Sequence, residues 1–269
     1  MTSIRRLLCA LLISFGFMAC DGIDDPFIDD DDDDDDVDEL IVTTSVLDNW
    51  WTWSVFAMTD PLIDPPADAA TAAQIVADSV DQYFMPAGCA SVERDGSALI
   101  YELTDCSGPL VPASIDGTLA ASFSMVGEAI EFDVSSRDLE INGVPAVLSV
   151  TGSYGASGAA RTVEYVASPA LSGIGDGFSA NFHGTVTWTA GSNCIRSDGD
   201  GQLTLAGRSW DATLAGFARC ADACPTAGVV TLSDAAEIVT LTFDGGADAT
   251  LLHSGGVAER VDLDCGRSR

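Results

Sequence analysis

Hydrophobic and polar residues alternate along most of the chain after residue 89. Glu131 and Asp133, for example, alternate with Ile130, Phe132 and Val134. The same period of two recurs over residues 185–189, 239–243 and 260–265. A strand with this pattern buries one face and exposes the other, as strands of antiparallel sheets do. The pattern predicts about ten to twelve antiparallel strands.

Turn signals separate these segments at short intervals. They are Asp95-Gly96, Asp116-Gly117, Asn142-Gly143, Asp198-Gly199-Asp200-Gly201, Gly245-Gly246 and Gly255-Gly256. Such pairs favour tight hairpins. Strands do not alternate with helices here, which excludes Rossmann and TIM folds. We therefore predict a mainly β fold: a large antiparallel meander, closed or half-closed like a barrel, with a β-sandwich as the alternative.

One or two helices are expected before the strands. Apolar residues from Ala72 to Phe84 form one stripe at helical spacing, and Asp64 is placed to cap this helix. Pro86 and Gly88 end it. Residues 40–58 contain β-branched residues that leave helix and strand open, although their apolar spacing favours a helix. The sequence thus predicts a helical segment over 40–86 at the start of a domain spanning 40–269.

The N-terminus has the organisation of an export signal. Arg5 and Arg6 precede an apolar run over 7–17, which is too short to span a bilayer. The run ends in Phe17-Met18-Ala19-Cys20, which resembles the lipobox of bacterial lipoproteins. This resemblance implies that residues 1–19 are a signal peptide and that Cys20 is lipidated, giving a membrane partner through the anchor. An ordinary secreted protein is the alternative.

Residues 20–39 form an acidic tether. From Asp21 to Glu39, 13 of 19 residues are acidic, including the unbroken run Asp29 to Asp36. Mutual repulsion predicts an extended, disordered segment. It resembles the acidic patch after the lipidated Cys of some surface-exposed bacterial lipoproteins, which implies the outer membrane or cell surface. Asp21 would imply the inner membrane by the enteric sorting rule. Of these two locations we favour the outer membrane or cell surface.

Net charge and cysteine content narrow the possible partners and sites. The chain carries 42 acidic and 11 basic residues, a formal charge of -31, which excludes nucleic acid as a partner.

Six cysteines follow the tether, and an even number in an exported chain implies disulfides. Around a predicted hairpin, Cys89 pairs with Cys106 if a looser turn or a bend at 104–105 brings them together. Among the open alternatives we choose Cys194–Cys220 and Cys224–Cys265.

Two further sets of residues are candidates for binding. Asp198 and Asp200, on their predicted turn, are a weak candidate for binding calcium. Residues 197–202 lack the ligand spacing of an EF-hand. We expect no other cofactor. Trp50, Trp51 and Trp53 either form a platform for sugars or are buried against a sheet.

No catalytic constellation stands out in the sequence. The chain has no G-x-S-x-G nucleophile elbow, and its acids are too numerous for any pair to be singled out. We therefore expect a non-catalytic envelope lipoprotein, structural or binding an unknown protein or glycan partner. An exported hydrolase that uses a carboxylate pair is the alternative.

Overall fold

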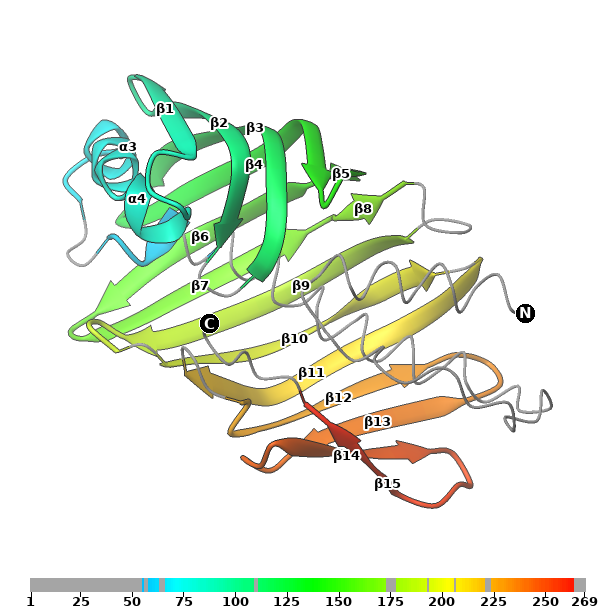
Figure 1. The fold of residues 1–269 in the computed structure, drawn as a ribbon. Coiled ribbons are helices and arrows are strands. Elements are labelled where there is room, and N and C mark those ends of the chain that lie inside the picture. The colour runs from blue at the N-terminus through cyan, green and yellow to red at the C-terminus, as the bar shows by residue number, and fades with distance from the viewer. Residues whose placement is uncertain are drawn as a thin grey trace.

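The structure is a computed structural model of the whole chain, and it describes residues 55, 58–62, 66–108, 111–172, 178–192, 194–205, 207–220 and 224–263. Within these residues, two short helices with described bounds precede fifteen strands (Figure 1). The elements are α3 (Ala69–Asp78), α4 (Val80–Tyr83), β1 (Ala90–Asp95), β2 (Ala98–Gly108), β3 (Val111–Val126), β4 (Ala129–Ile141), β5 (Val144–Val147), β6 (Ser149–Ser157), β7 (Ala160–Ala167), β8 (Ala170–Leu171), β9 (Phe178–Thr189), β10 (Cys194–Leu205), β11 (Arg208–Cys220), β12 (Ala227–Ser233), β13 (Ile238–Phe243), β14 (Asp248–His253) and β15 (Glu259–Asp262).

All fifteen strands belong to one antiparallel sheet that follows the chain as a meander. Within it, β4, β5, β8, β9, β7 and β6 form a partial ring. The ring arises because β5 and β6 both pair with β4, and β7 and β8 both pair with β9. Only Leu148 separates β5 from β6, so these are two halves of one long run. The predicted meander with partial closure is confirmed, and a single sheet replaces the β-sandwich alternative.

The predicted alternation sorts side chains onto two faces of the sheet. Ile130, Phe132 and Val134 of β4 are buried, whereas Glu131 and Asp133 between them are exposed. We call the face with the buried side chains the inner face and the opposite one the outer face. The inner face holds most of the core, which follows from the preference of apolar surface to leave water.

The helical segment packs beside the first strands. Helix α3 contacts β1, β2 and β3, and α4 contacts β1. The helix begins at Asp68, whose carboxylate accepts a hydrogen bond of 2.7 Å from the backbone N–H of Thr71. The cap is therefore Asp68, where the sequence indicated Asp64, a residue outside the described part of the chain. Of the helix expected over 40–58, residues 55 and 58 are helical and most of the others also lie outside it.

A short stretch before the helices enters the core from the inner side of the sheet. Met58 and Leu62 are buried. The Tyr154 hydroxyl, on the inner face of β6, donates a hydrogen bond to the carbonyl of Leu62. Tyr83 of α4 donates a second one, of 2.6 Å, to the Asp60 carboxylate. These bonds fix residues 58–62 against the sheet and against helix α4.

Two of the predicted turns lie inside strands. Asp116-Gly117 is in β3, where the register with β4 shifts, and residues 198–201 are in β10. Gly117 has φ +115°, and a Cβ there would lie 2.3 Å from the Asp138 carbonyl oxygen. Glycine thus marks a β-bulge at this point, a role it shares with turns and which sequence alone does not separate. The turns at Asn142-Gly143 and Gly255-Gly256 are present as predicted.

A candidate groove on the outer face

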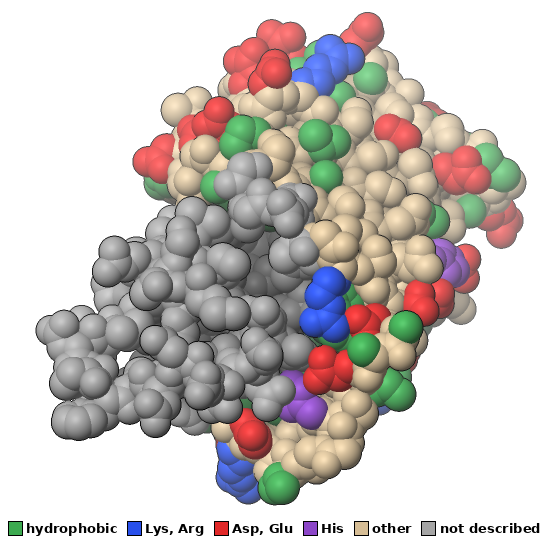
Figure 2. All heavy atoms as spheres, turned by 90° about the vertical axis from the view of Figure 1, so that its right-hand side faces the viewer, with side chains coloured by type: hydrophobic (Ala, Val, Ile, Leu, Met, Phe, Trp, Pro, Cys, Tyr) green, Lys and Arg blue, Asp and Glu red, His purple; other side chains and the backbone are tan. Residues whose placement is uncertain are grey.

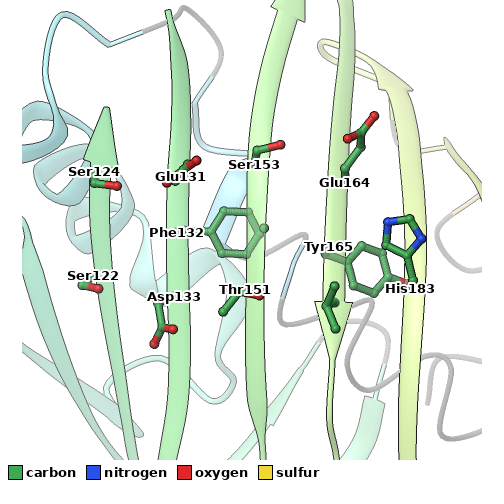
Figure 3. Close-up of a pocket in the computed structure, with 12 residues that line it drawn as sticks. Ser122, Ser124, Glu131, Phe132, Asp133, Thr151, Ser153, Glu164, Tyr165 and His183 are labelled. Carbon is green, nitrogen blue, oxygen red and sulfur yellow. The ribbon is translucent and has the colours of Figure 1, made fainter. Parts of the chain in front are cut away.

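A hollow of about 450 Å³ lies across β3, β4, β6, β7 and β9, and most of its lining consists of polar residues of the outer face (Figure 3). Its lining combines hydroxyl, carboxylate and imidazole groups with a few apolar ones: Ser122, Ser124, Glu131, Phe132, Asp133, Thr151, Gly152, Ser153, Glu164, Tyr165, Val166 and His183. It is the candidate site of this protein, because concave surfaces with converging polar groups are where small ligands bind.

The strand register arranges the polar side chains in two rows. In the first row, Glu131 of β4 lies opposite Ser153 of β6, which lies opposite Glu164 of β7. In the second, Asp133 lies opposite Thr151, and the row continues through Val166 to His183 of β9. Paired residues of neighbouring strands have side chains on the same face. Residues far apart in sequence therefore meet in one groove.

Two glycines allow aromatic rings to lie across neighbouring strands beneath these rows. A Cβ at Gly152 would lie 2.5 Å from Cζ of Phe132 and 2.8 Å from the carbonyl oxygen of Glu164. A Cβ at Gly184 would lie 2.6 Å from the Tyr165 ring. Figure 3 shows the Phe132 ring directed toward β6 and the Tyr165 ring toward β9. Glycine is needed at both positions because no other residue leaves room for the ring.

The groove is acidic, as is the protein as a whole. Three carboxylates and one imidazole line it, and none of its lining residues is Lys or Arg. Figure 2 shows acidic side chains spread over the described surface with few basic ones among them. The carboxylates and hydroxyls can accept hydrogen bonds from a polar ligand, and the carboxylates can also exchange protons with it.

The structure places the calcium candidates on the outer face of β10, outside the groove lining. Asp198 sits at a register shift, and its carboxylate accepts a hydrogen bond of 2.6 Å from the backbone N–H of Gly216. Asp200 lies opposite His183 of β9. The interpretation of this string as a tight turn was wrong, since both residues are in an extended strand. No group of three or more potential metal-ligating side chains occurs among the described residues, and calcium binding stays a prediction.

Two disulfides staple the sheet in the described residues. Cys89 is bonded to Cys106 and Cys194 to Cys220, as the sequence indicated. Asp105, with φ +51°, forms the bend that brings Cys106 back to Cys89, while the β1–β2 turn itself keeps two residues. Cys194 and Cys220 lie directly opposite each other in β10 and β11. Disulfides persist in oxidising compartments, so these bonds indicate an extracytoplasmic protein.

The remaining predicted site residues are only partly placed. Cys224 is disulfide-bonded, but its predicted partner Cys265 lies outside the described residues. Cys20 and the tryptophans Trp50, Trp51 and Trp53 also lie outside them. None of the helices in the described ranges is long and apolar enough to cross a membrane.

Sequence reasoning did not single out the residues of the groove. The alternation at Glu131 and Asp133 predicted that both point to solvent, and it did so correctly. The alternation could not supply the strand register. That register places Glu131 and Glu164 in one row on either side of β6, and Asp133 in one row with His183.

Comparison with models of protein families, with curated proteins and with solved structures found no match to this chain.

Proposed function

We propose that this protein is a non-catalytic, lipid-anchored protein of the bacterial envelope, held at the outer membrane or cell surface by Cys20. The observation that carries the proposal is the pair of disulfides in the described domain, because they require an oxidising compartment. The lipobox-like residues before Cys20 and the acidic tether over 20–39 supply the anchor and the spacer. A lipidated terminus that carries more than one acyl chain anchors a domain stably without a spanning helix.

The anchor is tested by replacing Cys20 with Ser in the full chain. We expect Cys20→Ser to abolish incorporation of labelled palmitate and to move the protein from the membrane fraction to the soluble fraction. Cys9→Ser is the matched control, because Cys9 lies in the predicted signal peptide, and it is expected to leave both properties unchanged. Retention of the Cys20→Ser variant in the membrane fraction would contradict lipidation at this residue.

In this proposal the groove on the outer face is where the domain binds a glycan or protein partner. The groove combines carboxylates and hydroxyls, and its polar character suits a polar ligand. Binding is measured on a glycan array with the unsubstituted protein, and on the Glu131→Gln and Ser153→Ala variants. The control is Glu93→Gln, an exposed residue of β1 outside the groove lining. Equal signals from all four proteins would place the binding site elsewhere.

A hydrolase that uses a carboxylate pair is the second candidate, and the observation that favours it is the row that contains Glu131 and Glu164. Both lie on the outer face, on strands separated by β6 alone. Two carboxylates flanking a scissile bond are the usual arrangement of glycoside hydrolases. Turnover of a glycan substrate that is lost in both Glu131→Gln and Glu164→Gln would replace the non-catalytic proposal with this one.

A further inference from the structure

The groove belongs to a row of side chains that crosses six strands of the outer face. From β3 to β10, the register places these residues opposite one another in turn: Ser124, Glu131, Ser153, Glu164, Thr185 and Asp198. Hydroxyl and carboxylate groups alternate along this row, which we call the acidic row. Its first four residues line the groove, and Figure 3 shows Glu131, Ser153 and Glu164 in line across three strands. The groove is therefore one part of a longer polar surface.

The carboxylates of the acidic row are open to solvent. Glu131, Glu164 and Asp198 are all exposed, and Asp133 adds a further exposed carboxylate two positions from Glu131 on β4. Among the described residues, none of these carboxylates forms an ion pair with a basic side chain. A surface lined with one sign of charge attracts partners of the opposite sign. Charge complementarity therefore favours a cationic partner for the outer face.

The carboxylates of the acidic row are regularly spaced. Glu131, Glu164 and Asp198 follow one another on every second strand. Neighbouring strands lie about 4.8 Å apart, which gives a repeat of about 9.6 Å. A peptide in the polyproline II conformation brings every third side chain to the same side, with a repeat of about 9.3 Å. Over the three carboxylates the two repeats differ by only about 0.6 Å.

Other peptide conformations match the acidic row less well. One face of a β-strand presents a side chain about every 6.6 Å, out of step with a repeat of about 9.6 Å. An α-helix is about 10–12 Å wide, whereas the acidic row and the row through Asp133 lie about 6.6 Å apart. The polyproline II backbone has no internal hydrogen bonds. Its carbonyl groups can therefore accept hydrogen bonds from the hydroxyls of Ser153 and Thr185, which lie between the carboxylates.

The attraction for a cation is weaker at the β10 end of the acidic row. Arg196 occupies the next outer-face position of β10, two residues before Asp198, and is exposed. The Asp198 carboxylate also accepts a hydrogen bond of 2.6 Å from the backbone N–H of Gly216. Both interactions reduce the pull of Asp198 on a further cation. Glu131 and Glu164, inside the groove, are therefore expected to be the main contacts.

We propose that the groove and the acidic row bind an extended cationic peptide segment of a partner protein, with Lys or Arg at every third residue. This inference rests on the proposed function, because it names the partner of the same groove. The carboxylates take the cationic side chains, and the hydroxyls between them take the peptide carbonyls. The row crosses five strand spacings, about 24 Å, which roughly eight residues of polyproline II cover.

The first test compares two peptides of identical composition, each with three Arg and six Pro. In the spaced peptide Arg occupies every third position, and in the clustered peptide the three Arg are consecutive. Binding to the oxidised full-length protein is measured by calorimetry at low ionic strength, where exposed charges are least screened. We expect the spaced peptide to bind at least about threefold more tightly, because it alone reaches successive carboxylates. Equal affinities would overturn the proposal.

The second test removes two carboxylates of the acidic row in the variant Glu131→Gln/Glu164→Gln. Its affinity for the spaced peptide should fall roughly three- to twentyfold, because each exposed charge pair contributes a small free energy. The matched control, Glu93→Gln/Glu259→Gln, changes the net charge equally at exposed residues of the edge strands β1 and β15. It should bind like the unsubstituted protein. An equal loss in both variants would trace binding to overall charge and contradict the proposal.

The glycan array separates this inference from the proposed function on which it rests. A glycan signal that is lost in Glu131→Gln, together with no binding of the spaced peptide, would refute the peptide partner and leave the groove as the binding site. Binding of the spaced peptide that is unchanged in Glu131→Gln/Glu164→Gln would refute both the peptide inference and the assignment of the groove.

Discussion

Replacing Gly152 with Ala tests whether the Phe132 ring needs the space that glycine leaves on β6. A Cβ at this position would lie 2.5 Å from Cζ of Phe132 and 2.8 Å from the carbonyl oxygen of Glu164. Both distances are below any normal carbon contact, and the second partner is backbone of the neighbouring strand. The ring cannot simply rotate away, because Phe132 is 3% exposed and packed in the core.

The structure sets the size of the expected effect. Overpacking by one methyl group in a filled core costs about 1–3 kcal/mol. For a domain of this size, a loss of about 2 kcal/mol lowers the melting temperature by roughly 4–8 °C. Gly155→Ala is the matched control, because Gly155 lies in the same strand and a Cβ there meets no atom within 4 Å. This control should be neutral or stabilising by about 0.4–1 kcal/mol, since alanine restricts the unfolded chain.

The assay is thermal unfolding of the oxidised protein followed by circular dichroism, with both variants and the unsubstituted chain measured side by side. The reasoning predicts a clear separation of the two variants, with Gly152→Ala the less stable. Equal melting temperatures for Gly152→Ala and Gly155→Ala would refute it, because the close approach of Phe132 is the feature that distinguishes these two sites.

Three further predictions concern other parts of the structure. Gly184→Ala should destabilise by about 1–3 kcal/mol through the Tyr165 ring, and the added substitution Tyr165→Leu should make the combined loss smaller than the sum of the single losses in a double-mutant cycle. Replacing both Cys194 and Cys220 with Ala opens a loop of 26 residues and should cost about 3 kcal/mol in urea unfolding of the oxidised protein; an unchanged midpoint would contradict a stapling role. The hydrogen bond from the Thr71 N–H lowers the pKa of the Asp68 carboxyl below its ordinary value of 3.8, so the cap stabilises above that pH and its contribution is lost as the pH falls through the folded-state pKa. The stability difference between the unsubstituted protein and Asp68→Ala, measured by denaturant unfolding, should therefore shrink on acidification below about pH 4, and a difference that grows there would contradict this sign.

The amino-acid sequence determined the local structure of this protein with few errors. The alternation at 130–134 fixed which side chains are buried, because period two permits only one assignment of faces in a strand. The apolar stripe from Ala72 to Phe84 predicted the helical segment, because residues that recur with a period of 3.6 lie on one face of a helix. The cap was expected at Asp64 and lies at Asp68, because Asp is favoured at the N-cap wherever the helix begins and the local pattern does not say which Asp begins it.

Only the tertiary structure decided what the glycines and the acids do. Gly117 lies at a bulge and residues 198–201 lie in a strand, although both strings read as turns, because glycine serves either purpose and neighbouring strands determine which one applies. Glu131 and Glu164 face one groove because β4, β6 and β7 pair in one register. That register arises from contacts between segments distant along the chain, and a local pattern of hydrophobic and polar residues carries no record of it.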